Sequence, residues 1–150
     1  MKKIKLSITG CMGRMGKQLI KSSINNSDFK LVSLTESFQI NKRVNKILPQ
    51  LNSLSSFKNS NVIIDFTVPK CTMQVLQIAS ELNKRVVIGT TGFTKKQEDM
   101  IKSFSNKIPI LKAGNMSLGI NLLMYLTEIA SQALGNNFLS KVYEVHHKHK

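Results

Sequence analysis

Cysteine is scarce in this sequence. The 150 residues contain two cysteines, Cys11 and Cys71, which lie far apart and form no CxxC pair. A cysteine-rich zinc site therefore cannot be built from them. Because cysteines are few and no export signal accompanies them, we expect both to be reduced thiols.

Long hydrophobic runs and a leader segment are also missing. The N-terminus begins with lysines and reaches Gly10 after a brief apolar stretch, without a signal-peptide core or a small-residue cleavage site. The longest apolar run, LGINLLMYL at residues 118–126, is interrupted by Asn121 and followed by Thr127 and Glu128. It is too short and too polar at its end to span a bilayer. The sequence therefore predicts a cytoplasmic protein without membrane contact.

Acidic residues are few, with 8 Asp and Glu against 22 Lys and Arg, so that the net charge is +14. Such an excess raises the question of nucleic-acid binding. The basic residues are scattered along the whole chain rather than gathered in one stripe. Nearly all of them are lysine, and asparagine and isoleucine are also abundant, which is typical of an AT-rich genome. We therefore expect no nucleic acid as the main partner, although a basic polynucleotide-binding protein stays open as an alternative.

Strand-like and helix-like segments alternate along the chain. Strands are expected over residues 4–9, 30–36, 61–67, 85–91, 108–113 and 141–147. Helices are expected over residues 14–23, 69–82, 94–105 and 116–134. This alternation predicts an α/β fold, a Rossmann-like parallel sheet with helices on both faces. The last helix is apolar on most sides, so we expect it to be largely buried, whereas residues 37–60 are expected to hold little regular structure.

A glycine-rich turn, GCMGRMG from Gly10 to Gly16, lies where the first strand ends and the first helix begins. Glycines there let the backbone approach a pyrophosphate, and the helix N-terminus offers N–H groups and a positive dipole end. Because Met12 stands at the usual second glycine position, the turn by itself also fits an ordinary strand–helix connection. Glu36 follows the second strand, where dinucleotide sites place an acid for the adenosine ribose. The combination favours a dinucleotide site over a solvated loop glutamate.

Two further polar segments follow strands. GTTGF, from Gly89 to Phe93, follows the fourth strand, and KAGNMSLGIN, from Lys112 to Asn121, follows the fifth. Ligands in open α/β sheets bind outside the carboxyl ends of the strands. Within the second segment, Asn115 or Ser117 could cap the long helix. Each segment alone also fits an ordinary loop.

The chain ends in YEVHHKHK, with three histidines and two lysines in the last five residues. Three interpretations are open: a solvated basic tail, a metal site, or a proton donor cut off from the rest of its active site. Neither a carboxylate nor a cysteine is arranged with the histidines to complete a metal site. Histidine and lysine are natural proton donors at neutral pH. The residues alone leave the choice open.

The segments GCMGRMG, IIDFTVP, VIGTTGF, GNMSLGINLL and EVHHKHK are similar, in order and spacing, to the 4-hydroxy-tetrahydrodipicolinate reductase (dihydrodipicolinate reductase) family over essentially the whole chain. The resemblance implies an NAD(P)H-dependent oxidoreductase that reduces 4-hydroxy-tetrahydrodipicolinate to tetrahydrodipicolinate in the diaminopimelate route to lysine. It implies a dinucleotide-binding domain at residues 1–115. Residues 116–150 would then be a hinge helix and the start of a substrate and tetramerisation domain. The implied partner is a small cyclic dicarboxylate, and the family forms homotetramers.

The resemblance also implies which residues form the site. Cofactor contacts are expected from the phosphate-binding turn, the ribose acid, the nicotinamide side and the hinge, namely Gly10, Cys11, Met12, Gly13, Arg14, Met15, Glu36, Gly89, Thr90, Thr91, Ala113, Gly114, Asn115 and Met116. His146 matches the family's catalytic proton donor or acceptor, and His147 matches its substrate-binding neighbour. Lys150 matches the catalytic lysine that donates a proton and meets a substrate carboxylate. No metal is implied.

Two departures from the family bear on function. Ser37 stands where many members carry a basic residue that helps to hold the 2′-phosphate of NADPH, which favours NADH, although Lys42 and Arg43 lie close enough in sequence to compensate. The family also continues past the histidine motif by a substrate domain of about 100 residues. The sequence thus fits a fragment, a truncated product or one piece of a split enzyme. For such a chain, activity and tetramer formation are uncertain, and a non-catalytic dinucleotide-binding module is the alternative function.

Overall fold

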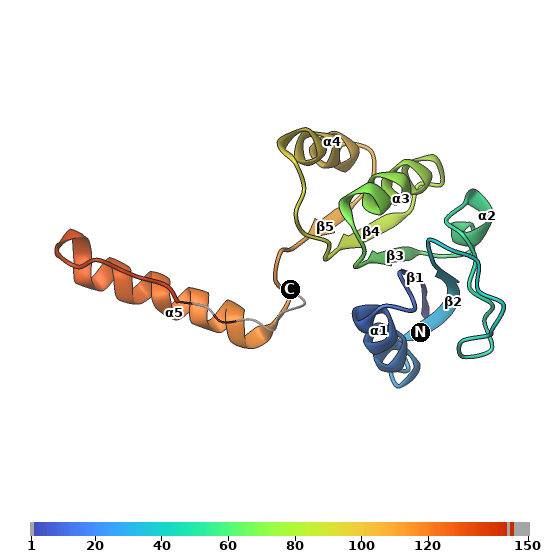
Figure 1. The fold of residues 1–150 in the computed structure, drawn as a ribbon, viewed down its shortest axis with the longest axis horizontal. Coiled ribbons are helices and arrows are strands. Elements are labelled where there is room, and N and C mark those ends of the chain that lie inside the picture. Colours follow the sequence, from blue (N-terminus) through green and yellow to red (C-terminus); the bar gives the residue numbers. More distant parts are fainter. Residues whose placement is uncertain (1, 144, 146–150) are drawn as a thin grey trace. The chain divides into compact units, whose positions relative to one another are not determined.

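The protein is described by a computed structural model that covers residues 2–143 and 145. The chain divides into two compact units, residues 1–114 and residues 115–150. In the first unit, parallel strands form a sheet with the order β2-β1-β3-β4-β5 (Figure 1). The fold is therefore the predicted Rossmann-like α/β type, built here around this strand order.

The elements of the first unit follow the hydrophobic pattern of the sequence. The strands are β1 (Ile4–Thr9), β2 (Phe29–Thr35), β3 (Val62–Asp65), β4 (Arg85–Ile88) and β5 (Ile110–Lys112). The helices are α1 (Arg14–Ile24), α2 (Leu54–Phe57), α3 (Pro69–Glu81) and α4 (Lys95–Ser105). Every strand and helix expected between residues 4 and 113 forms, with ends shifted by a few residues. Figure 1 shows α1 on one face of the sheet and α3 and α4 on the other.

Residues 37–60 hold little regular structure, as expected, and their one named element is the single-turn helix α2. Ser53 begins this short helix, and its hydroxyl accepts a hydrogen bond from the Ser56 backbone N–H at 3.2 Å, while Ser56 Oγ accepts one from the Ser53 N–H at 3.0 Å. Phe57 of α2 is fully buried against residues of α3 and the sheet. A reciprocal serine cap and a buried aromatic side chain are sufficient to fix one helical turn within a polar segment.

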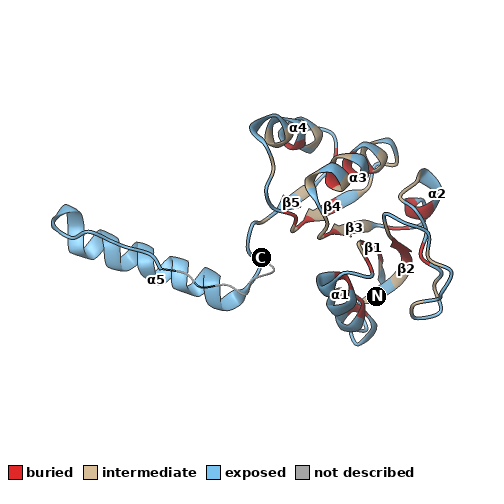
Figure 2. Ribbon diagram, viewed as in Figure 1, coloured by how far each residue is buried: buried red, intermediate tan, exposed pale blue. Residues whose placement is uncertain are grey.

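Buried residues lie in the strands and in the helices beside them (Figure 2), and the apolar ones form two clusters. One joins Ile8 and Leu34 of the sheet to Ile20 of α1. The other, larger cluster combines Phe57 with buried residues of β3, β4, α3, α4 and the connection from α4 to β5, namely Ile63, Val75, Leu76, Ala79, Val86, Ile88, Ile101 and Ile108. Each large aliphatic side chain buried in this way contributes about 1.5–3 kcal/mol, so these clusters hold the sheet and its helices together.

The order of the strands creates a switch point between β1 and β3. The chain leaves β1 for β2 on one side and returns to β3 on the other side of β1. The two connections therefore diverge at the carboxyl ends of β1 and β3. In parallel α/β sheets, a crevice at such a point is the usual place for a ligand.

The second unit contains α5 (Leu118–Leu134) and a short 3₁₀ helix, η1 (Gly135–Asn137). Ser117 caps α5, since its hydroxyl accepts a hydrogen bond from the Ile120 N–H at 3.5 Å. The helix was predicted correctly, but its predicted burial is wrong, because α5 has no buried residue (Figure 2). Its apolar side chains find no covering layer among the described residues of this unit.

The strand expected at residues 141–147 is not formed at residues 141–143 or at Val145, and the rest of that segment lies outside the described residues. A single strand without a neighbour has no ladder of hydrogen bonds to hold it, which accounts for the difference. Among the described residues, none of the helices has the length and apolar character needed to cross a membrane.

Candidate functional site

The turn after β1 brings backbone N–H groups to the carboxyl edge of the sheet. Gly10 has φ +62°, and a Cβ at this residue would lie 2.7 Å from Cγ2 of Thr67, so glycine is required there. Gly13 donates its N–H to the Gly10 carbonyl at 3.0 Å and forms the N-cap of α1. Within the described chain, α1 has no side-chain cap and no acidic residue in its first turn. Its N-terminal N–H groups and positive dipole end therefore suit an anion.

Glu36 is connected to this turn by hydrogen bonds. Its Oε2 accepts the Met12 N–H at 3.1 Å, and its Oε1 accepts the Ser37 N–H at 3.0 Å. The Cys11 N–H donates to the Thr35 carbonyl at 3.2 Å, which holds the same two segments together one residue earlier. The carboxylate is thus fixed beside the turn, in the position that a ribose-binding acid requires.

Cys11 lies beneath the turn and is fully buried. Burial, followed by the nearby negative charge of Glu36, raises the pKa of the Cys11 thiol to about 11. The thiol is therefore neutral at physiological pH, so it packs as a small apolar group and does not act as a nucleophile.

Two adjoining clefts open beside Glu36, with volumes of about 250 Å³ and about 530 Å³. The smaller cleft reaches the turn at Gly10 and Gly13, and the larger one extends to Lys70 and Gln74 of α3. Their shared walls are formed by Glu36, Ser37, Asn52, Val68 and Cys71. These volumes lie in the range of small-molecule sites, so the clefts suit a phosphate–ribose unit and the ring attached to it.

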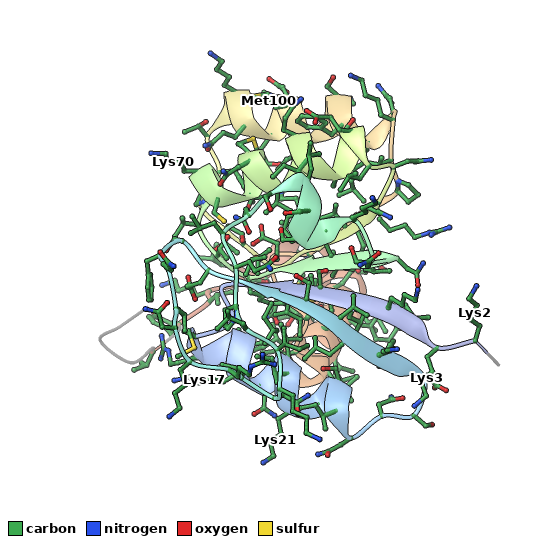
Figure 3. The ribbon with its side chains drawn as sticks, turned by 90° about the vertical axis from the view of Figure 1, so that its right-hand side faces the viewer. Lys2, Lys3, Lys17, Lys21, Lys70 and Met100 are labelled. Carbon is green, nitrogen blue, oxygen red and sulfur yellow. The ribbon has the colours of Figure 1, made fainter. Side chains whose placement is uncertain are left out.

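Lysines from two helix N-termini stand at this edge of the sheet. Figure 3 shows Lys17 of α1 and Lys70 of α3 on one side of the first unit, and Lys2 and Lys3 on the opposite side, where β1 begins. Lys17 and Lys70 are exposed. A positive field at the edge that also carries the turn favours an anionic ligand.

The segment after β4 lies on the other side of β3. The Gly89 N–H donates to the Asp65 carbonyl at 2.8 Å, and a Cβ at Gly89 would overlap the Phe66 ring. Thr90 is buried, and its hydroxyl oxygen accepts the Thr67 N–H at 2.9 Å. The Ala113 N–H donates to the Ile88 carbonyl at 3.1 Å, which brings the end of β5 alongside. The structure therefore assembles the turn, Glu36, Gly89, Thr90 and Ala113 along one edge of the sheet.

Other predicted residues are placed differently. Thr91 is exposed, and Arg14 and Met15 lie exposed in the first turn of α1. Gly114 ends the first unit, whereas Asn115 and Met116 belong to the second, where Asn115 Oδ1 accepts the Ser117 N–H at 2.7 Å. His146, His147 and Lys150 lie outside the described residues.

Lys42 and Arg43, in the loop after Glu36, do not line the two clefts described above. Arg43 donates to the Lys46 carbonyl at 2.9 Å, within its own loop, and Lys42 is exposed. The cation that lines the larger cleft is Lys70, which the sequence did not single out.

Three residues at the end of β3 were also missed. Asp65, Phe66 and Thr67 contact Gly10 on one side and Gly89 and Thr90 on the other. The available signal was an aspartate that ends an otherwise apolar strand, VIID, with a threonine two residues later. A charged residue in such a place predicts a buried polar network.

The family model and the similar curated proteins agree on one family. The family model described as "Dihydrodipicolinate reductase, N-terminus" matches residues 4–116. The 4-hydroxy-tetrahydrodipicolinate reductase of Pelagibacter ubique is 65% identical over 150 residues, which are 100% of this chain and 58% of that protein. The enzyme of the same name from Buchnera aphidicola is 38% identical over 160 aligned positions, covering 99% of this chain and 60% of its own.

A solved structure gives the same result. The dipicolinate-bound dihydrodipicolinate reductase from Paenisporosarcina sp. TG-14 superposes with a TM-score of 0.73 and 27% identity, over 86% of this chain and 54% of that one. The chain thus spans somewhat more than half the length of the relatives that it matches.

Proposed function

The chain belongs to the dihydrodipicolinate reductase family, and from this premise we propose that it supplies the dinucleotide-binding part of a 4-hydroxy-tetrahydrodipicolinate reductase. The proposed reaction reduces 4-hydroxy-tetrahydrodipicolinate to tetrahydrodipicolinate, with loss of the hydroxyl group as water, in the diaminopimelate route to lysine. The observation that supports it best is the Glu36 carboxylate held 3.1 Å from the Met12 N–H, beside an uncapped helix N-terminus. A soluble dinucleotide and a small dicarboxylate also fit the cytoplasmic location expected from the sequence.

The residues present fit a pyridine dinucleotide. A Cβ at Gly10 would collide with Thr67, so the glycine keeps the turn tight. The N-terminal end of α1 that follows the turn has no side-chain cap and would face the pyrophosphate. Glu36 would accept hydrogen bonds from the adenosine ribose, and the cleft of about 530 Å³ would hold the adenine. Thr90 and Ala113 would border the nicotinamide. When bound, the cofactor supplies the hydride for the reduction.

The last residues of the chain would provide the proton chemistry. In this proposal His146 and Lys150 deliver a proton to the developing amine, while His147 and Lys150 hold the substrate carboxylates. Residues 1–115 form the dinucleotide-binding domain, and residues 116–150 begin the substrate and tetramerisation domain. The remainder of that domain in a complete enzyme would cover the apolar surface of α5.

We further propose that NADH is preferred over NADPH. A 2′-phosphate would stand beside the Glu36 carboxylate and would meet Ser37 rather than a cation. The negative charges of the phosphate and the Glu36 carboxylate would repel each other, and the Ser37 hydroxyl cannot neutralise a phosphate. Lys70 lines the same cleft but is exposed, so its charge is screened by solvent.

Titration of the chain with NADH, followed by the fluorescence of the bound nicotinamide, tests the main proposal. Glu36→Gln is expected to raise the Kd by at least about tenfold, because hydrogen bonds to a charged group contribute about 1.5–3 kcal/mol. Glu81→Gln is the matched control, since Glu81 is exposed on α3 and bonds Gln77 of the same helix. An unmodified chain that binds no NADH at millimolar concentration, or equal effects of the two substitutions, would contradict the proposal.

The cofactor preference has its own test. Ser37→Arg adds a cation where the 2′-phosphate would lie and is expected to improve the NADPH to NADH affinity ratio by about tenfold. Ser22→Arg adds the same charge at an exposed position of α1 and serves as the control. A clear preference of the unmodified chain for NADPH would rule out the proposed selectivity.

A further inference from the structure

A buried carboxylate at the end of β3 collects the hydroxyl groups of four threonines. Asp65 is fully buried. Its Oδ1 accepts hydrogen bonds from the Thr9 hydroxyl at 2.7 Å and from the Thr67 hydroxyl at 2.6 Å. Its Oδ2 accepts the Thr72 hydroxyl and, at 3.4 Å, the Thr90 hydroxyl. One side chain thus connects the ends of β1, β3 and β4 with the first turns of α3.

Two of these threonines reach the candidate cofactor site. Cγ2 of Thr67 lies against Gly10, at 2.7 Å from the position that a Cβ there would take. The Thr90 hydroxyl binds Asp65 and also accepts the Thr67 N–H at 2.9 Å, so its rotamer is fixed from two sides. The carboxylate is therefore one hydrogen bond away from the phosphate-binding turn on one side and from the nicotinamide-side segment on the other.

From this arrangement we infer that Asp65 is the positioning residue of the site. It sets the spacing between the Gly10–Gly13 turn and the Gly89–Thr90 segment, through Thr67 and Thr90. It does so at the switch point between β1 and β3, where the connections that leave the two strands diverge to opposite sides of β1. The consequence for cofactor binding rests on the function proposed above, whereas the consequence for the backbone does not.

The chemistry of the network explains why an acid stands at this position. A carboxylate only accepts hydrogen bonds and can accept several at once, so four hydroxyl donors from separate elements must all point toward it. Hydrogen bonds to an ionised acceptor are shorter and stronger than those between neutral groups. An apolar residue would fill the same space but would leave the rotamers of Thr67 and Thr90 undetermined.

Thr72 offers the cleanest test, because it is fully buried and touches no ligand surface. Thr72→Val keeps the shape of the side chain and removes the hydroxyl that Asp65 Oδ2 accepts. Thr72→Ser restores that hydroxyl and removes only a methyl group. Val75→Ala is the control for general destabilisation, since Val75 is equally buried on the same helix but belongs to the apolar cluster.

Two measurements on the 150-residue chain would be made for each variant: amide hydrogen exchange, resolved by residue, and the Kd for NADH. Thr72→Val is expected to speed exchange at Gly10–Gly13 and Gly89–Thr90 relative to the rest of the sheet. It is also expected to raise the Kd by about tenfold, as loss of one charge-assisted hydrogen bond would. Thr72→Ser is expected to behave as the unmodified chain, and Val75→Ala to change neither quantity selectively.

The two measurements separate this inference from the proposed function. If the unmodified chain does not bind NADH, the proposed function fails, and the exchange rates alone decide the role of Asp65. The inference would be overturned if amide exchange at Gly10–Gly13 and Gly89–Thr90 were equally fast in Thr72→Val and Val75→Ala, whatever the result for NADH. Equal loss of NADH binding in those two variants would overturn its cofactor part. Asp65→Asn is expected to give a larger effect in the same direction, and the Thr72 pair keeps the test valid if that variant does not fold.

Discussion

The two units of this chain differ in what their apolar side chains contact. In the first unit, helix α3 buries Thr72, Val75, Leu76 and Ala79, which lie at the spacing of one helical face. In the second unit, helix α5 is the more apolar of the two but buries none of its residues. Leu76 is 0% exposed, whereas Leu118 is 84% exposed and Leu126 is 52% exposed.

This difference shows that the apolar composition of a helix does not by itself determine whether the helix is buried. A helix forms in both units because capping and propensity act locally, through Pro69 at the start of α3 and the Ser117 hydroxyl at the start of α5. Burial depends on a neighbour, and α3 obtains one from the sheet and from α4. The local signals in α5 therefore specify the helix but not its contacts, and the energetic consequences of substitutions should differ sharply between the units.

The largest expected contrast is between Leu76→Ala and Leu126→Ala. Loss of a fully buried leucine leaves a cavity and is expected to lower the free energy of unfolding by about 2–5 kcal/mol. Loss of half-exposed Leu126 is expected to change it by less than about 0.5 kcal/mol. Urea denaturation followed by circular dichroism measures both. A cost for Leu126→Ala that approaches that of Leu76→Ala would show that α5 is covered in solution and would remove the contrast.

Replacing one glycine by alanine in each unit is expected to change stability by a smaller amount, with opposite signs in the two units. Gly89→Ala would force a Cβ into the Phe66 ring and is expected to destabilise the first unit by about 1–3 kcal/mol. Gly119→Ala lies in α5, where the added Cβ would meet the Ser117 hydroxyl at 3.9 Å, an ordinary contact. It is expected to stabilise that helix by about 1 kcal/mol, because alanine is the better helix former.

Thermal melts followed at 222 nm measure both glycine variants. Gly89→Ala should lower the midpoint of the main transition, and Gly119→Ala should raise the helical signal at low temperature. A destabilising Gly119→Ala would mean that α5 packs closely against another segment at this position. That result would contradict the exposure of α5.

The success of the predictions from sequence also differs between the two units. The strands and helices of the first unit could be predicted because their periodicity and their burial agree, as in β1, where Ile8 enters the core and Thr9 faces Asp65. The turn at Gly10 and the acid at Glu36 could be predicted from glycine spacing and from position after a strand. Their hydrogen-bonded connection through the Met12 N–H confirms that the two segments are adjacent.

The misses have identifiable causes. Burial of α5 was inferred from its own sequence, but burial is a property of two surfaces. Helix α2 was missed because four residues are too few for a hydrophobic period, and only the serine cap marked it. The Asp65 network was missed because its donors Thr9, Thr72 and Thr90 come together only through the strand order. The aspartate that ends β3 indicates that a buried polar network exists, but no local pattern identifies its distant donors.

A further expected effect concerns pH, and it is confined to the first unit because the buried thiol of Cys11 lies there. The pKa of Cys11 is raised from its usual value near 9 to about 11, chiefly by burial and then by the charge of Glu36. The folded state therefore retains the thiol proton at pH values where the unfolded chain has already lost it. The stability that depends on this group is complete below pH 9 and is lost as the pH rises toward 11.

At pH 10.5 this linkage amounts to a loss of about 2 kcal/mol relative to pH 8, at about 1.4 kcal/mol for each unit of pKa difference. Cys11→Ala removes the titrating group, so the difference between its pH dependence and that of the unmodified chain isolates the effect from the titration of lysines. Urea denaturation at pH 8 and pH 10.5 measures it. Parallel pH profiles for the two chains would show that the Cys11 thiolate is tolerated in the folded state. The turn would then be open to water, and the first unit would be less tightly packed at its carboxyl edge than its buried residues indicate.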